Sequence, residues 1–191
     1  MKNILIAVVF TFNLCAAQQF SFGLVSGVQS FSGNNFMAKT YKSHFFSKID
    51  LRHSFKNKMG VSTYFSFALP NIKTTEFIGN SSSARVTEVG VLALYNINFS
   101  KNWDFIPKIG IGYQQLKNTL DADNKKSYFT NGAVYNLGSE FQYRFNEDFS
   151  LNASLDYGFV DLSHVQSSRF VDTSYQSSNK IGVSAGVRFL F

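Results

Sequence analysis

The 191-residue chain is rich in aromatic residues, with 22 Phe and 9 Tyr, and only 16% of its residues are charged, against about a quarter in ordinary soluble domains. Its net charge of +6 comes without a Lys/Arg cluster or a nucleic-acid-binding motif, so we expect no nucleic-acid partner. Contact with anionic lipid headgroups suits the surplus positive charge better. The one cysteine, Cys15, excludes a disulfide framework.

The first 17 residues have the pattern of a cleaved export signal. Lys2 provides a positive start, residues 4–14 are mostly apolar, and Cys15-Ala16-Ala17 places small residues before the expected cleavage point. Roughly a dozen apolar residues are too few for a membrane-spanning helix, which needs about 20. We therefore predict that residues 1–17 form a signal peptide and that residues 18–191 form one domain.

From residue 19 onward, apolar and polar residues alternate in eight segments, which is the pattern of strands with one apolar face. The segments are residues 19–31, 44–55, 60–69, 88–99, 105–114, 135–145, 151–159 and 179–191. The last, NKIGVSAGVRFLF, shows the alternation most clearly, with apolar side chains at every odd position from Ile181 to Phe191. Pro107 lacks a backbone donor and is expected at a strand end or a bulge.

The connections alternate in length. Short polar turns fall at residues 56–58, 100–102 and 146–148, whereas long polar loops fall at residues 32–43, 70–84, 118–127 and 161–178. Short periplasmic turns and longer outer loops are typical of outer-membrane barrels. The pattern predicts an all-β fold, an eight-stranded antiparallel transmembrane up-and-down β-barrel with both termini at the periplasmic end. Ten strands are possible if the last loop holds a hairpin around residues 169–171.

The chain resembles the small outer-membrane β-barrel family of OmpX and the OmpA barrel, which is porin-like in fold. The resemblance lies in the signal peptide, the eight alternating segments, the alternating lengths of the connections and the terminal GVRFLF. The resemblance implies a place in the bacterial outer membrane, among outer-membrane lipids and lipopolysaccharide. It also implies that the last strand closes the barrel against the first, with Val187, Phe189 and Phe191 as the signal read by the barrel-assembly machinery. A monomer with a possible extracellular ligand on its long loops is expected.

The same periodicity also fits a soluble periplasmic lipocalin-like carrier, whose apolar face points inward. Composition favours the membrane barrel, because the polar face consists largely of Gly, Ser and Asn rather than Lys and Glu. Small side chains suit the cramped interior of an eight-stranded barrel. Aromatic residues near the strand ends suit girdles at the two membrane interfaces.

Nine charged residues fall on the predicted interior face: Lys48, Asp50, Arg52, Glu88, Lys108, Glu140, Arg144, Asp156 and Arg188. Five are positive and four are negative, a near balance that predicts a network of ion pairs, because charges in a confined interior need partners. Arg52, Glu140, Arg144 and Arg188 lie nearest the periplasmic strand ends. We expect these four to form a network that closes that end. The alternative is a narrow ion path lined by the same groups.

A structural or surface-interaction role, in membrane integrity and loop-mediated binding or adhesion, fits these features. The alternatives are a small pore or transporter for minor solutes and a lipid A-modifying enzyme. Asp161, Ser163 and His164 superficially offer a catalytic set, but adjacent residues of a strand face opposite ways, so we predict no enzyme. No cofactor or metal site is expected: His44 and His53 read as interface residues at strand ends. The segment around Asp121 lacks the glycine and glutamate of a calcium loop.

Overall fold

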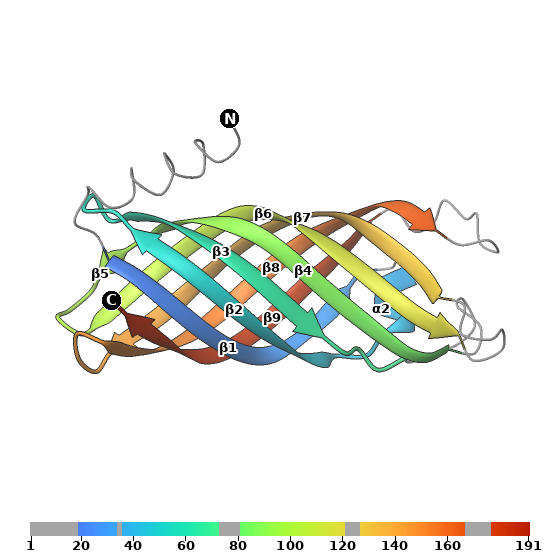
Figure 1. Ribbon diagram of the computed structural model, residues 1–191, viewed down its shortest axis with the longest axis horizontal. Coiled ribbons are helices and arrows are strands. Elements are labelled where there is room, and N and C mark those ends of the chain that lie inside the picture. The colour runs from blue at the N-terminus through green and yellow to red at the C-terminus, as the bar shows by residue number, and fades with distance from the viewer. Residues whose placement is uncertain (1–18, 34–35, 73–80, 121–126, 167–176) are drawn as a thin grey trace, which may run out of the picture.

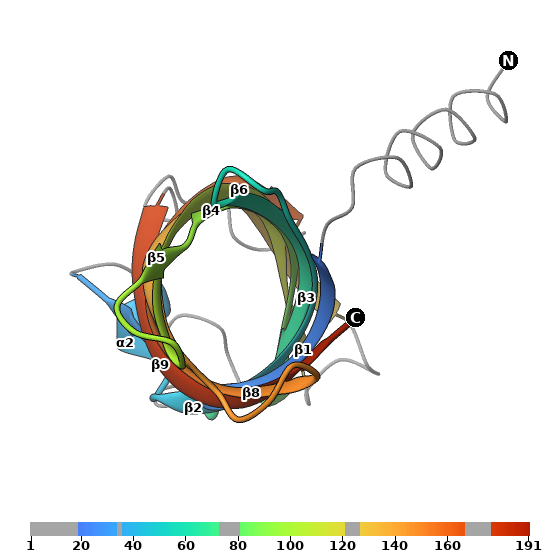
Figure 2. The ribbon, with the colours of Figure 1, turned by 90° about the vertical axis from the view of Figure 1, so that its left-hand side faces the viewer.

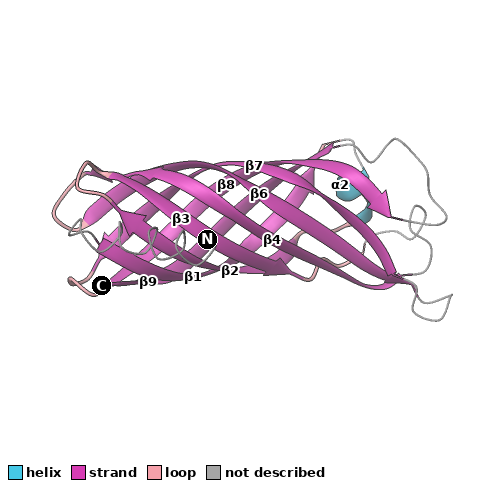
Figure 3. Ribbon diagram, turned by 45° about the horizontal axis from the view of Figure 1, so that its top comes forward, coloured by secondary structure: helices cyan, strands magenta, loops and turns pink. Residues whose placement is uncertain are grey.

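The computed structural model describes residues 19–33, 36–72, 81–120, 127–166 and 177–191, which form one antiparallel sheet closed into a barrel (Figures 1 and 2). The strands are β1 (Gln19–Ser32), β2 (His44–Ser54), β3 (Met59–Ala68), β4 (Ser81–Tyr95), β5 (Ile97–Asn98), β6 (Trp103–Leu120), β7 (Ser127–Arg144), β8 (Phe149–Gln166) and β9 (Ser177–Leu190). One short helix, α2 (Phe36–Thr40), interrupts the strands (Figure 3). Among the described residues, no helix is long and apolar enough to cross a membrane.

Consecutive strands pair with each other, except that β4 pairs with β6 rather than β5, and β9 pairs with β1 to close the ring, with Phe22 opposite Phe189. β5 lies in line with β4, because both pair with β6 in one register: Leu94 faces Lys108 and Ile97 faces Phe105. The prediction of a closed eight-stranded antiparallel barrel is confirmed, with β5 as a short extra segment after the fourth strand. The possible hairpin around residues 169–171 lies outside the described residues.

Pro107 was expected at a strand end or a bulge, but it lies at neither. It lies inside β6 and pairs regularly with Ser139 of β7. On its other side the pairing with the fourth strand is interrupted at Tyr95, the last residue of β4, and at Asn96, which precedes β5. A proline has no N–H to donate to a sheet ladder. β6 therefore continues through Pro107, and the interruption of pairing lies in the adjacent strand, between the ladders formed by β4 and β5.

Short turns and long loops lie at opposite ends of the barrel. The turns before β3, β6 and β8 lie at the end where β1 begins and β9 ends, whereas α2 lies at the other end (Figure 1). The strands reach further toward the long loops than expected: β4 begins at Ser81, β6 ends at Leu120 and β8 ends at Gln166. These Ser- and Asn-rich ends look like loops in sequence, but ladder pairing with neighbouring strands holds them extended.

The apolar face of every strand points outward. Phe45, Ile111 and Val183 are 78%, 64% and 61% exposed, and most of the predicted girdle aromatics are exposed as well. A soluble carrier would bury these side chains, so the inward-facing alternative is wrong. An apolar outer surface of this extent is stable only against lipid.

Candidate functional site

A network of ion pairs crosses the interior in the half of the barrel near the short turns. We call this network the belt; its members are Lys48, Asp50, Arg52, Lys108, Glu140, Asp156 and Arg188. The Arg188 guanidinium donates to both carboxylate oxygens of Asp50, at 3.0 and 2.9 Å, and to Ser21 Oγ at 3.1 Å. Ser62 also donates to Asp50, at 3.1 Å. Arg188 is 1% exposed, so this charge-assisted pair, in which one nitrogen donates to both carboxylate oxygens, connects β9 to β2 away from water.

Glu140 of β7 lies at the centre of the belt. The Arg52 guanidinium donates to both of its carboxylate oxygens at 3.0 Å. Arg188 Nε and Lys108 Nζ approach the same carboxylate at 3.9 and 3.8 Å. Lys108 also contacts Asp156 at 2.8 Å, and Lys48 reaches that aspartate at 3.3 Å. Shared carboxylates thus link cations of three different strands into one network.

A separate polar group lies further toward the long loops. Lys180 forms an ion pair with Glu88, and Tyr64 donates to Glu88 at 2.6 Å. Asn136 donates to Glu88 at 3.2 Å and to the Tyr64 hydroxyl at 2.7 Å. A Cβ atom at Gly90 or Gly112 would lie 2.6 Å from that hydroxyl, so glycines on β4 and β6 make room for the tyrosine. Small residues on the interior face therefore allow the crossing contacts.

The structure places all nine predicted residues on the interior face but joins them differently from the prediction. Arg52, Glu140 and Arg188 meet in the belt, whereas Arg144 pairs with Asp104 at 3.0 Å near the barrel end. Asn98 also donates to Asp104, at 2.5 Å. Asp104 and Lys180 were missed by sequence reasoning. Both have the interior parity of their strands, and extending the alternation to each strand end would have found them.

An apolar layer fills the interior at the other end of the barrel. Its buried side chains are Phe31, Met37, Tyr41, Phe46, Ala68, Ala84, Val86, Leu116, Val134 and Val160. Met37 belongs to α2, and Tyr41, directly after the helix, donates from its hydroxyl to Asn118 of β6 at 2.9 Å. The segment between β1 and β2 is therefore packed into the barrel and anchored on a strand distant in sequence.

Two cavities lined by described residues border the belt. One of about 280 Å³ lies at the turn end, and one of about 50 Å³ is lined by Lys48, Glu88 and Lys180. They share no lining residue. The larger cavity is lined by Arg52 and Arg188 and the smaller by Lys48 and Asp156, so belt residues border both.

The residues considered for catalysis or metal binding form no described site. β8 runs through Ser163 and His164, whose side chains lie outside the described part of the chain. His44 is not an interface residue as expected: it is buried and lies 3.0 Å from the Gln29 amide. His53 lies against Phe20 and Phe55, with ring centroids 4.5 and 4.7 Å apart. Within the described residues, no three His, Cys, Asp or Glu side chains gather to hold a metal ion.

Comparison with known proteins settles the family. The model of the outer membrane protein beta-barrel domain family matches residues 4–189. The chain belongs to this family. Curated proteins provide no match. Members of the family and its structural neighbours are bacterial outer-membrane proteins, which agrees with the predicted location.

Solved structures share the fold at low identity. Neisserial surface protein A is 11% identical with a TM-score of 0.68, covering 89% of this chain and 96% of that one. A major outer membrane protein from Thermus thermophilus is 13% identical with a TM-score of 0.62, covering 90% and 99%. Ail, the attachment invasion locus protein of Yersinia pestis, is 15% identical with a TM-score of 0.53, also covering 90% and 99%.

Proposed function

We propose that this outer-membrane barrel is a non-conducting structural protein that presents its long loops as a surface for interaction. The observation that supports this role is the filled interior. The ion-pair belt and the apolar layer around Met37 and Tyr41 lie in series along the barrel axis. An ion crossing the barrel would have to separate buried ion pairs and then displace packed side chains, and both steps are costly.

A fixed first loop fits the surface-interaction role. The Tyr41–Asn118 hydrogen bond anchors the segment after α2, while Lys39 and Lys42 of the same segment remain exposed. An anchored segment loses less conformational entropy when it binds a partner than a free loop does. The attachment protein of Yersinia pestis has the same fold, which makes adhesion one form of this role.

Planar-bilayer conductance of the purified protein tests the closed interior. We expect no discrete current steps. Steps whose size or ion preference changed in a Lys108→Met variant would mean that the lumen conducts, and the small-pore alternative would replace this proposal. Steps unaffected by that substitution would come from a contaminating porin.

The surface role needs a cellular test. We expect deletion of the gene to increase sensitivity to detergent or to reduce surface attachment, and the intact chain to restore either property. A chain with residues 33–43 replaced by a Gly/Ser linker should insert but restore less attachment. Full restoration by this variant would argue against a role for the first loop.

A further inference from the structure

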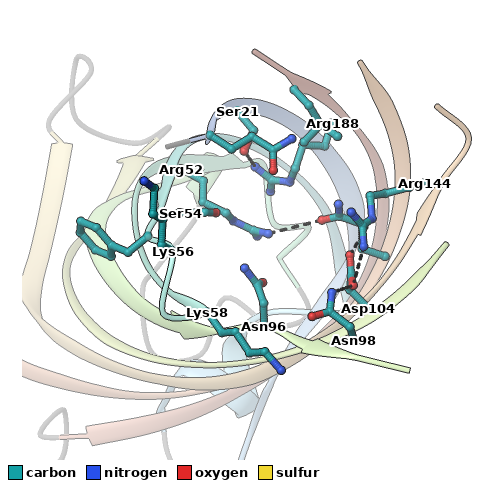
Figure 4. A pocket seen from close by; sticks show the side chains of 14 residues that line it. Ser21, Arg52, Ser54, Lys56, Lys58, Asn96, Asn98, Asp104, Arg144 and Arg188 are labelled. Carbon is teal, nitrogen blue, oxygen red and sulfur yellow. Dashed lines mark hydrogen bonds and ion pairs between the residues drawn. The ribbon is translucent and has the colours of Figure 1, made fainter. Parts of the chain in front are cut away.

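The larger cavity, at the end of the barrel where the short turns lie, is called here the periplasmic cup (Figure 4). Its charged lining residues are Arg52, Lys56, Lys58, Asp104, Arg144 and Arg188. A water molecule takes up about 30 Å³ in the liquid, so a cavity of about 280 Å³ has room for a small polyatomic anion and several waters.

The side chains that line the cup carry an excess of positive charge. Five cationic side chains line it against one carboxylate, Asp104, which already binds Arg144 and Asn98. The carboxylates that pair with the two belt arginines, Asp50 and Glu140, are not among its lining residues. Within the described part of the chain, Lys56 and Lys58 form no ion pair. Because Arg52, Arg144 and Arg188 are each paired with a carboxylate, the surplus positive charge of the cup comes from Lys56 and Lys58 near its opening.

Unused hydrogen-bond donors lie on the same arginines. Arg52 and Arg188 are 4% and 1% exposed, and the Nε atom of each is buried with no hydrogen-bond acceptor among the described residues. A buried donor without an acceptor costs free energy. Neither Nε atom is accessible from the cup, and Arg188 Nε lies 3.9 Å from Glu140, so an anion in the cup would contact the other atoms of the two arginine side chains.

The turn that carries the two lysines is held in place. Lys58 has a φ of 68°, the left-handed conformation needed by the last residue of this kind of hairpin turn. Its carbonyl accepts from the Asn96 N–H at 2.7 Å, and Phe55 N–H donates to Met59 at 2.7 Å. The backbone beneath both lysines is thus fixed before any ligand arrives, which lowers the entropy cost of binding.

We propose that the periplasmic cup binds a small phosphate-type oxyanion, either inorganic phosphate or the phosphate of a small ester. Donors from β2, β7, β9 and the first turn approach from different sides, which suits a tetrahedral anion with oxygens in several directions. The closed barrel wall separates the cup from the bilayer, so the ligand enters as a free anion. The site does not depend on whether the lumen conducts.

Equilibrium dialysis of the full-length barrel in maltoside micelles, with radiolabelled inorganic phosphate at low ionic strength, tests this site. We expect saturable binding of one phosphate per barrel, displaced by sulfate. The Lys56→Gln/Lys58→Gln variant should bind about tenfold more weakly, since each exposed charge contributes modestly. The Lys39→Gln/Lys42→Gln variant loses the same charge at the opposite end and should bind within about twofold of the wild type. Equal losses in both variants, or no saturable binding, would overturn the proposal.

A gain-of-function variant gives an independent test. Asp104→Asn removes the only carboxylate among the described residues that line the cup and frees Arg144, so phosphate affinity should rise severalfold. No rise would overturn the assignment of the cup as the site. Dialysis in nanodiscs of anionic and of neutral phospholipid should give equal affinities. A weaker affinity in the anionic discs would mean that lipid headgroups occupy the cup and would overturn entry as a free anion.

Discussion

The two halves of the barrel interior are stabilised by opposite chemistry. Toward the short turns, Asp50, Arg52, Glu140 and Arg188 fill the lumen with shared ion pairs. Toward the long loops, the lumen is filled by aliphatic and aromatic side chains, including Met37 delivered by α2. The belt and the apolar layer both fill the lumen at their own level, one through paired charge and the other through apolar packing.

The two halves should respond differently when a substitution removes an interior side-chain group. An ion-pair network tolerates no missing partner, because the remaining charge stays buried without compensation. An apolar layer loses free energy in proportion to the side-chain volume removed. Substitutions of matched size in the two halves should therefore cost different amounts of unfolding free energy.

The largest effect is expected from Glu140→Gln. The substitution leaves Arg52 without its carboxylate partner and removes a second carboxylate contact from Arg188 and Lys108. Breaking a buried pair in this way costs about 3–5 kcal/mol of unfolding free energy. Urea titration followed by the heat-modifiable gel shift measures it. Glu147→Gln, in an exposed turn, is the control and should change stability by less than about 0.5 kcal/mol. Equal effects would mean that the belt does not stabilise the fold.

The apolar layer is tested by Leu116→Ala, where a fully buried leucine is shortened. We expect a loss of about 3 kcal/mol, from lost transfer free energy and the cavity left behind. Leu155→Ala removes the same atoms from the outer face, where the leucine is 55% exposed and lipid chains can fill the space. The inner variant should lose about 1 kcal/mol more than the outer one in the same titration. Equal losses would indicate a loosely packed layer.

A stabilising substitution is expected at Gln114, in the same half of the lumen. Its side chain is fully buried, and neither its amide nitrogen nor its oxygen has a hydrogen-bond partner among the described residues. Gln114→Leu should raise the unfolding free energy by about 1–2 kcal/mol, because it removes an unsatisfied polar group. Gln115→Leu, on the opposite face of β6, serves as the control. A loss of stability in Gln114→Leu would reveal a bound water that satisfies the amide.

The charged half was largely predictable from sequence, because each residue of an alternating strand lies on one of only two faces, and the charged residues share the polar face. Parity alone placed Glu140 and Arg188 in the lumen. Their partners were less predictable, since contacts across a barrel depend on strand stagger and on side-chain length. Arg144 was expected in the belt, yet its guanidinium meets Asp104 on the neighbouring strand instead.

The apolar half was not predicted, because its strands carry apolar residues on the interior face as well, so apolar and polar residues no longer alternate there. Val86, Leu116 and Val134 are apolar residues on the interior face, so alternation fades where they occur and the segments read as loops. The sequence of α2 also shows no pattern from which a helix could be predicted. A five-residue helix is stabilised by Met37 and Tyr41 packing into the lumen rather than by helix propensity.

The smallest effect is expected from Arg144→Gln. It tests whether the Arg144–Asp104 pair near the barrel end contributes less to stability than the buried belt does. The Arg144 side chain is 34% exposed, against 5% for Arg52. A partly solvated pair contributes at most about 1 kcal/mol and is screened by salt. The loss should therefore disappear when the urea titration is repeated in about 1 M salt, where the screening length is about 3 Å. The loss in Glu140→Gln should persist there, since salt does not reach a buried carboxylate. A large, salt-insensitive loss in Arg144→Gln would mean that the Arg144–Asp104 pair belongs to the buried network.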